Sequence, residues 1–119
     1  MSRVYVFDAS ALIALFRAFK PAFDLFMEAD AGRTQLVFPA AAIGEANTYI
    51  RASESAWAPL LMGRVESTPL SEHIAITVGT WPGDLPTRHV AYEAYAVRGP
   101  IVTREGGRYT PWTVSLLEL

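Results

Sequence analysis

Residues 4–19 read VYVFDASALIALFRAF, and this stretch decides the fold class. Its first four residues form an unbroken apolar run of β-favouring types, which is typical of a strand buried on both faces of a parallel sheet. The run ends at Asp8, and Ser10 is the predicted N-cap of a following helix. The apolar residues of that helix recur at i, i+3, i+4 and i+7, namely Leu12, Leu15, Phe16 and Phe19. A buried strand that leads directly into an amphipathic helix is the building unit of an α/β fold.

Strands and helices alternate along the rest of the chain. A second short strand is predicted at 36–38, followed by a helix from Pro39 to about Arg51, and a third core strand at 100–103. The other predicted elements are a helix from Pro21 that ends before Gly32, a broken helix at 55–62, an extended segment at 65–70, a helix from Ser71 that stops before Pro82, a helix at 87–97 and an edge strand at 114–119. This order predicts one domain, residues 1–119, with an α/β sandwich fold around a mainly parallel sheet.

The composition excludes several classes of protein. The 119 residues include no cysteine, which rules out a thiol nucleophile, a disulfide framework and a thiolate metal site. The net charge of −2 argues against a globally basic nucleic-acid clamp. No apolar run reaches the roughly 18 residues of a membrane span, and the first residues lack a signal-peptide layout, so we expect a cytoplasmic protein without a membrane partner. Only 18% of the residues are charged, against about 25% in a typical domain, and we therefore expect a buried partner face.

Three acidic residues are predicted to meet at one edge of the sheet. Asp8 directly follows the first strand, Glu45 lies on the helix after the second, and Glu105 lies two residues beyond the third. Sites of open parallel sheets form beyond the carboxyl ends of the strands. Carboxylates gathered there repel one another by about 4 kcal/mol per pair at 4 Å in a medium of effective dielectric 20, and Mg²⁺ or Mn²⁺ would remove that repulsion. Taken singly, each acid also has an ordinary structural explanation: Asp8 as a helix cap, Glu45 as a solvated helix residue and Glu105 as a loop acid.

Three segments resemble the motif regions of PIN domains, and of VapC toxins from toxin–antitoxin pairs in particular. They are VYVFDASALIALF (4–16), FPAAAIGEANTYIR (38–51) and RHVAYEAYAVRGPIVTREGGRY (88–109). The resemblance spans about residues 3–117. It implies a three-layer α/β/α sandwich and a ribonuclease that uses Mg²⁺ or Mn²⁺ to cut RNA by attack of water. It also implies a homodimer and a small antitoxin protein as partner.

The resemblance carries four acidic positions onto this chain. Asp8 and Glu45 match the first two family acids, and Glu105 matches the fourth; these three are the implied metal ligands. The third position falls on Thr87, which carries no negative charge. Asp84, three residues earlier, either replaces that carboxylate and completes the catalytic set or is only a turn residue after a glycine.

Two functions therefore remain open. The first is a VapC-like, metal-dependent endoribonuclease weakened by the loss of one acid. The second is a catalytically inactive PIN-like module that binds a protein partner or RNA, which the threonine at an acid position and the low surface charge favour.

Two smaller features also await an explanation. Arg104 either contacts an RNA phosphate or balances Glu105. His89 and Glu93 share a helix face, and they are either a metal or acid–base pair or, more commonly at this spacing, a surface hydrogen bond.

Overall fold

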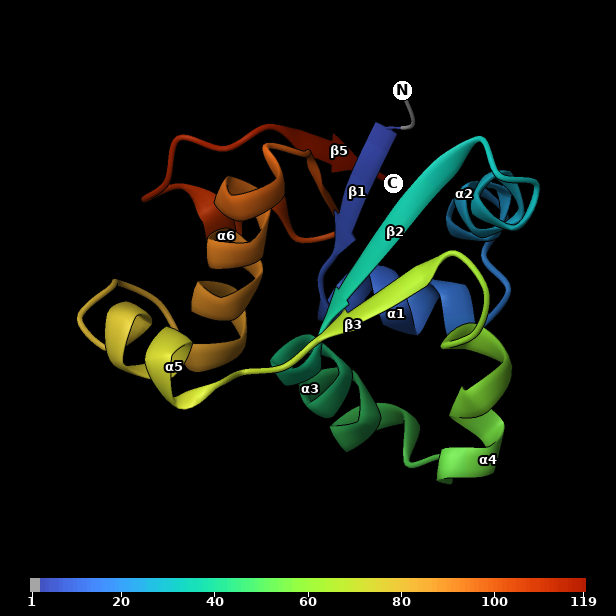
Figure 1. Ribbon diagram of the computed structural model, residues 1–119, viewed down its shortest axis with the longest axis horizontal. Helices are drawn as coiled ribbons and strands as arrows, with labels where there is room; N and C mark the ends of the chain where they lie inside the picture. The colour runs from blue at the N-terminus through green and yellow to red at the C-terminus, as the bar shows by residue number, and fades with distance from the viewer. Residues whose placement is uncertain (1–2) are drawn as a thin grey trace.

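A computed structural model describes residues 3–119, and its centre is a five-stranded parallel sheet (Figure 1). The strand order is β3-β2-β1-β4-β5, and every neighbouring pair is parallel. The strands are β1 (Arg3–Phe7), β2 (Thr34–Pro39), β3 (Val65–Thr68), β4 (Ile101–Thr103) and β5 (Leu116–Glu118). The predicted parallel sheet is therefore confirmed, and the two weakly patterned segments at 65–70 and 114–119 form its two edges.

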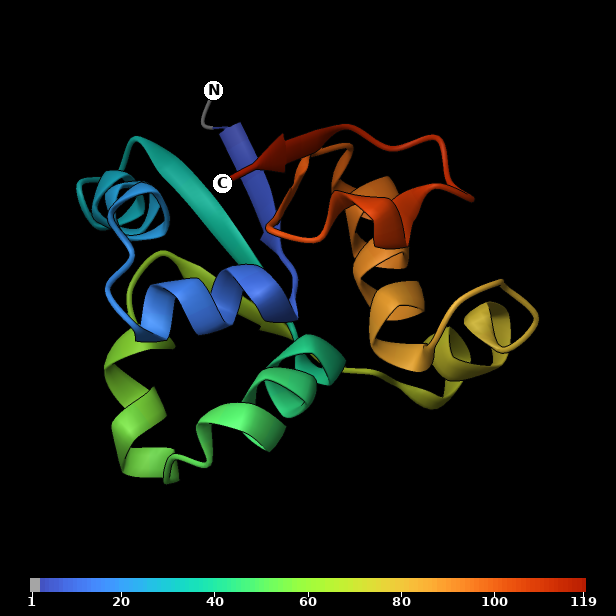
Figure 2. The same cartoon turned by 180° about the vertical axis from the view of Figure 1, so that it is seen from behind.

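Helices cover both faces of the sheet, which confirms the expected α/β/α layering. They are α1 (Ala9–Phe16), α2 (Lys20–Asp30), α3 (Ala40–Ile50), α4 (Glu54–Trp57), α5 (Glu72–Val78) and α6 (Leu85–Val97), with 3₁₀ turns η1 (Ala58–Leu60) and η2 (Gly106–Tyr109). Helix α1 packs on β1 and β4 on one side, the near side in Figure 2, whereas α6 packs on β1, β2 and β4 from the other. Helix α3 contacts both α1 and α6, so it closes the carboxyl end of the sheet.

Two helices begin earlier than the sequence pattern predicts, and both differences have the same cause. Helix α1 starts at Ala9 because Asp8, rather than Ser10, is its N-cap and accepts a hydrogen bond from the backbone N–H of Ala11. Helix α6 starts at Leu85 because Asp84 caps it through the N–H of Thr87, at 3.0 Å. An aspartate one turn upstream satisfies an otherwise unpaired N–H, and this adds a half-turn to each helix.

The core lies between the sheet and these helices. Phe7 and Phe38 at the carboxyl ends of β1 and β2 are fully buried, with ring centroids 5.3 Å apart. Leu36 and Ile101 extend the same buried layer along β2 and β4. Because the ends of these strands are held rigidly by packing, the residues that follow them have fixed positions. Among residues 3–119, no helix combines the length and the apolar character that a membrane crossing requires.

Candidate functional site

The candidate site lies at the crevice where the strand order reverses. Strand β2 lies on one side of β1 and β4 on the other, and ligand sites of open parallel sheets form at such a switch point. A pocket of ≈ 540 Å³ opens there, between α1, the second half of α3, the start of α6 and the loop after β4. Its lining includes Glu45, Asp84 and Glu105, three of the four predicted acids.

The three carboxylates converge on one arginine, Arg108. Its Nη1 and Nη2 donate to the two oxygens of Glu45, each at 3.1 Å. Nη2 also donates to both oxygens of Asp84, at 3.0 and 2.9 Å. Glu105 lies slightly farther away, with an oxygen 3.6 Å from Nη1. A planar guanidinium is suited to such fork-like contacts, and here one guanidinium joins acids from three separate elements.

The electrostatics keep the partners of this cluster charged. Burial by itself would lower the pKa of Arg108, but Glu45 and then Asp84 raise it far above its usual range. Burial likewise opposes ionisation of Asp84, yet hydrogen bonds from Thr87 and the charge of Arg108 hold its pKa below the ordinary value. The ion pair between Arg108 and Asp84 therefore persists at neutral pH.

Asp8 has a different environment and does not line this pocket. Its carboxylate is 1% exposed. Oδ1 accepts hydrogen bonds from the Ser10 hydroxyl at 2.7 Å and from the N–H of Ala11 at 2.9 Å, while Oδ2 accepts one from the Tyr109 hydroxyl at 2.9 Å. Burial, and then the neighbouring Asp8, raise the pKa of Tyr109 well above its usual range, so this hydroxyl keeps its proton. Asp8 thus caps α1 and holds η2 in place.

The structure brings together Glu45, Asp84 and Glu105. Asp8 lies apart from them, because its oxygens accept hydrogen bonds from Ser10, Ala11 and Tyr109. Thr87, the position matched to the third family acid, is 3% exposed and contributes its backbone N–H rather than a ligand. Asp84 supplies the carboxylate at the start of this helix instead. The sequence reasoning missed Arg108 and Tyr109 as site residues; the only available signal was a local excess of arginine in the segment that carries Glu105.

A divalent cation does not fit these residues as they are arranged here. Within residues 3–119, no three Asp, Glu, His or Cys side chains lie close enough together to hold one ion. The oxygens of Glu45 and Asp84 are engaged by Arg108, and those of Asp8 by Ser10, Ala11 and Tyr109. The donor chemistry suits Mg²⁺ or Mn²⁺, but the position among the carboxylates is taken by a cationic side chain. The predicted metal site therefore stays a prediction.

The His89–Glu93 pair is buried between α6 and its neighbours, whereas its spacing favoured a surface contact. Nε2 of His89 and Oε2 of Glu93 are 3.5 Å apart, and neither atom has a hydrogen-bond partner in the described part of the chain. Nδ1 of His89 accepts a long hydrogen bond, 3.4 Å, from the N–H of Ala41 in the first turn of α3. Burial lowers the pKa of His89 and raises that of Glu93, so both neutral forms are favoured.

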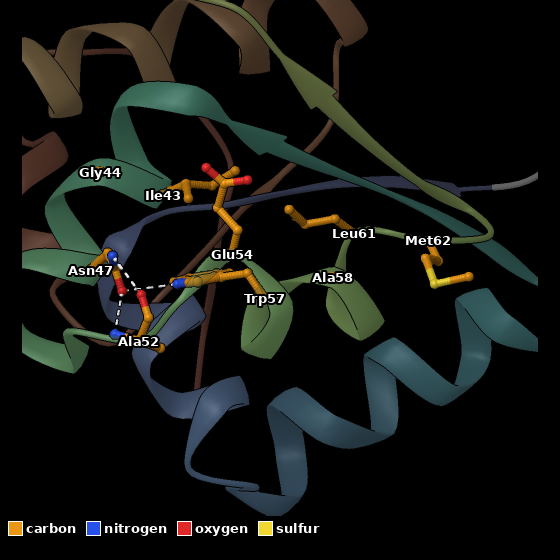
Figure 3. Close-up of a pocket in the computed structure, with 9 residues that line it drawn as sticks. All are labelled: Ile43, Gly44, Asn47, Ala52, Glu54, Trp57, Ala58, Leu61 and Met62. Carbon is orange, nitrogen blue, oxygen red and sulfur yellow. Dashed lines mark hydrogen bonds between the residues drawn. The ribbon is translucent and has the colours of Figure 1, made fainter.

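A second hollow, of ≈ 620 Å³, lies between α3 and the segment that carries α4 and η1 (Figure 3). Asn47 organises one end of it: its Oδ1 accepts hydrogen bonds from Nε1 of Trp57 and from the N–H of Ala52, both at 2.9 Å. Side chains such as Ile43 and Leu61 make its lining mainly apolar. This hollow offers packing surface rather than reactive groups, so the acidic pocket remains the candidate for chemistry.

Comparison with known proteins supports the fold. The sequence matches no protein-family model, and it matches no curated protein. The structure does match chains of solved structures. One is a chain of the crystal structure of VapBC2 from Rickettsia felis bound to a DNA fragment from their promoter. The TM-score is 0.65 and the identity 15%, and the match covers 98% of each chain. A likeness at this identity shows the fold, and the PIN-like α/β/α arrangement expected from the sequence is confirmed on that basis.

Proposed function

We propose that this chain is a PIN-like endoribonuclease of the VapC kind that uses Mg²⁺ or Mn²⁺, with Asp8, Glu45, Asp84 and Glu105 as its catalytic acids. The observation that carries the proposal is the convergence of Glu45, Asp84 and Glu105, far apart in sequence, on one point at the crevice after β1 and β4. Carboxylates repel one another, and a site that holds several of them close together is typical of one that binds a cation or a phosphate. The proposed metal ligands are Asp8, Glu45 and Glu105.

The proposed partners follow from the same resemblance. The similar structure is a VapBC2 complex bound to promoter DNA. By analogy, this chain pairs with a small antitoxin protein, acts on RNA in the cytoplasm and forms a homodimer. A chain with few charged residues is suited to having part of its surface covered by such partners.

RNA cleavage by the purified chain tests the proposed activity. The wild type with Mg²⁺ or Mn²⁺ is expected to cut RNA, and the chelator EDTA should stop the reaction. Asp8→Asn and Glu45→Gln should lose most of the cleavage, because each removes a proposed ligand charge. Glu72→Gln is the matched control, since Glu72 is an exposed acid in the first turn of α5. If circular dichroism shows that Asp8→Asn is folded and it still cuts RNA as fast as the wild type, the proposal is wrong.

The second candidate function is a non-catalytic PIN-like module that binds RNA or a protein. The observation that favours it is that Arg108 pairs with both Glu45 and Asp84 and so engages their oxygens. Electrophoretic mobility shifts with labelled RNA separate the two functions. Binding that is equally tight with Mn²⁺ and with EDTA, and that leaves the RNA intact, supports the module and contradicts the nuclease.

A further inference from the structure

We infer that a hollow beside the acidic pocket binds one nucleotide of the RNA strand, and that Arg17 and Arg104 contact its phosphates. The hollow, here called the arginine hollow, has a volume of ≈ 480 Å³, and its lining includes Arg17, Phe19 and Arg104. This inference names a substrate-binding subsite and rests on the proposed function.

The arginine hollow shares a wall with the acidic pocket. Ser10, Ile13 and Arg17 line both, and so does Glu105. The first three lie at i, i+3 and i+7 along α1 and its C-cap, so they share one face of that helix. This face runs for roughly 10 Å from Ser10 to Arg17. A strand that passes along it contacts both hollows, and the arginine hollow then takes a nucleotide next to the one at the acids.

The guanidinium groups of Arg17 and Arg104 are available to a ligand. Both residues are exposed, and among residues 3–119 neither of them forms an ion pair with a carboxylate. Within this part of the chain, Arg104 therefore does not balance the charge of Glu105, which was one of its two possible roles. The planar fork of donors on each arginine matches the geometry of a phosphate group.

Arg104 is held in position at both of its ends. Its backbone N–H donates a hydrogen bond to Oγ of Ser10, at 2.8 Å. Its guanidinium carbon lies over the ring of Phe19, 4.3 Å from the ring centroid. Because this stacking already restricts the side chain, a phosphate bound by Arg104 orders fewer rotamers than one bound by an unsupported arginine.

The charge and the apolar surface of the two hollows favour a nucleotide over an acidic peptide. The three carboxylates of the acidic pocket outnumber its two arginines, and Arg104 brings the two hollows to equal numbers of acidic and basic side chains. Excess negative charge then no longer opposes the approach of a polyanion. Ile13, Ala14 and Phe19 provide apolar surface in the arginine hollow. A sugar or a base packs against such a surface, whereas the carboxylates of an acidic peptide do not use it.

Fluorescence anisotropy with a labelled oligouridylate tests the inference on the full chain, in EDTA so that the RNA stays intact. Arg17→Gln and Arg104→Gln should each weaken binding about tenfold, because each loses a charged hydrogen bond to a phosphate. The slope of log K against log salt should become shallower by about 0.7 in each variant, which is the value for one phosphate contact on a single strand. Arg98→Gln is the matched control and should bind as the wild type does, since Arg98 lies beside the start of β1, at the opposite end of the sheet. Unchanged binding by either test variant, or no binding by the wild type, overturns the inference.

A lysine variant separates the charge of Arg104 from its shape. Arg104→Lys keeps the positive charge but lacks the planar fork, so its salt slope should equal that of the wild type and its affinity should lie between those of the wild type and Arg104→Gln. An affinity no higher than that of Arg104→Gln contradicts a phosphate contact at this residue.

Competition with unlabelled polymers identifies the kind of ligand. Oligouridylate should displace the labelled RNA, and an oligoglutamate peptide of equal length should not. Displacement by oligoglutamate as strong as that by oligouridylate would assign the arginine hollow to an acidic protein partner. Stronger displacement by oligothymidylate than by oligouridylate would assign it to DNA, and either result overturns the inference.

Cleavage assays on the same proteins separate this inference from the proposed function. If Arg17→Gln and Arg104→Gln weaken RNA binding and the wild type leaves RNA intact with Mn²⁺, the subsite stands and the nuclease proposal fails. If the wild type cuts RNA with Mn²⁺ and neither variant weakens binding, the nuclease proposal stands and the subsite fails.

Discussion

Arg108 and Tyr109 are neighbours in sequence, and their side chains have opposite environments. Arg108 reaches into the pocket and pairs with Glu45 and Asp84, while Tyr109 turns inward and donates its hydroxyl to the buried Asp8. This hydrogen bond ties the loop after β4 to the start of α1. A hydrogen bond to a buried charged acceptor contributes more to stability than one between neutral groups.

Removal of the Tyr109 hydroxyl is therefore expected to destabilise the fold. Tyr109→Phe should lower the free energy of unfolding by about 2 kcal/mol, because one oxygen of Asp8 loses its donor in the interior. Urea denaturation followed by tryptophan fluorescence measures this change. Tyr49→Phe is the control: Tyr49 is 67% exposed, and its loss should change stability by less than about 0.5 kcal/mol. Equal stability of the two variants would contradict the structural role of the hydroxyl.

At the scale of elements, helix α6 connects the site with the sheet: its start carries Asp84 of the site, and the residue after its C-cap contacts β1. Asp84 caps its start and faces Arg108. At the other end, Arg98 adopts the left-handed conformation with φ of 53°, and Gly99 passes directly against the backbone of β1. The ends of α6 are therefore determined by a side chain at one terminus and by backbone contact at the other.

Gly99 is predicted to tolerate no side chain. A Cβ atom there would overlap the carbonyl oxygen of Val4 in β1, so Gly99→Ala should lower the free energy of unfolding by about 1–3 kcal/mol. Gly44→Ala, on α3, should have the opposite sign and raise it by up to about 1 kcal/mol, since a Cβ atom there meets no atom within 4 Å and alanine favours helix. Thermal denaturation of both variants gives the comparison. A Gly99→Ala protein as stable as the wild type would show that β1 and the segment after α6 can move apart to make room for the side chain.

The first turn of α3 depends on a neutral histidine from α6. Its N-cap, Pro39, provides no side-chain hydrogen bond, and Nδ1 of His89 accepts from the N–H of Ala41 instead. Burial lowers the pKa of His89 below its ordinary 6.5, so the stability that neutral His89 contributes is complete above about pH 6.5 and is lost as the pH falls through the lowered pKa. Glu93, whose pKa burial raises, changes stability with pH in the opposite direction.

A single variant isolates the histidine from that opposing carboxyl group. His89→Asn keeps an acceptor for Ala41 but does not titrate, so the stability of the wild type relative to this variant should fall between pH 7 and pH 5. Urea denaturation at several pH values measures the difference. A pH-independent difference between the wild type and His89→Asn would rule out the cap.

At the scale of the whole molecule, one buried apolar cluster connects all the parts that carry the site. It extends from the strands β1, β2 and β4 to α1, α3 and α6. The acidic pocket lies at the rim of this cluster, where the strands end and polar side chains begin. Its geometry therefore depends on packing that is distributed over most of the chain.

Phe38 tests that dependence, because it lies in the middle of the cluster. Phe38→Ala should lower the free energy of unfolding by about 3–5 kcal/mol, since a fully buried ring that packs 5.3 Å from Phe7 leaves a cavity. Phe23→Ala, which removes a ring that is 42% exposed, should cost far less. Chemical denaturation should remain a single transition for both. Similar losses for the two variants would contradict the central position of Phe38.

The sequence by itself determined the order of the elements and the meeting of Glu45 and Glu105 at one edge; Asp8, which was predicted to join them, is bound by Ser10, Ala11 and Tyr109 instead. Apolar periodicity and capping residues are local signals, so the strands and helices could be predicted to within a few residues. The parallel sheet then required that the residues after β1 and β4 lie side by side, and three of the four predicted acids do share one pocket. Even so, the sequence did not decide which residue caps α1, Asp8 or Ser10, or which caps α6, Asp84 or Thr87. Both members of each pair are polar and lie close together in sequence.

Only the tertiary structure decided what those acids contact. Arg108 reaches Glu45 across a separation of 63 residues, and Tyr109 reaches Asp8 across 101. His89 became buried because α6 packs against α3 and the sheet, although its spacing from Glu93 is equally common on exposed helices. Local patterns report which face of an element is apolar, but the partner of a polar side chain is selected by where distant segments come to rest, and no short window of sequence contains that information.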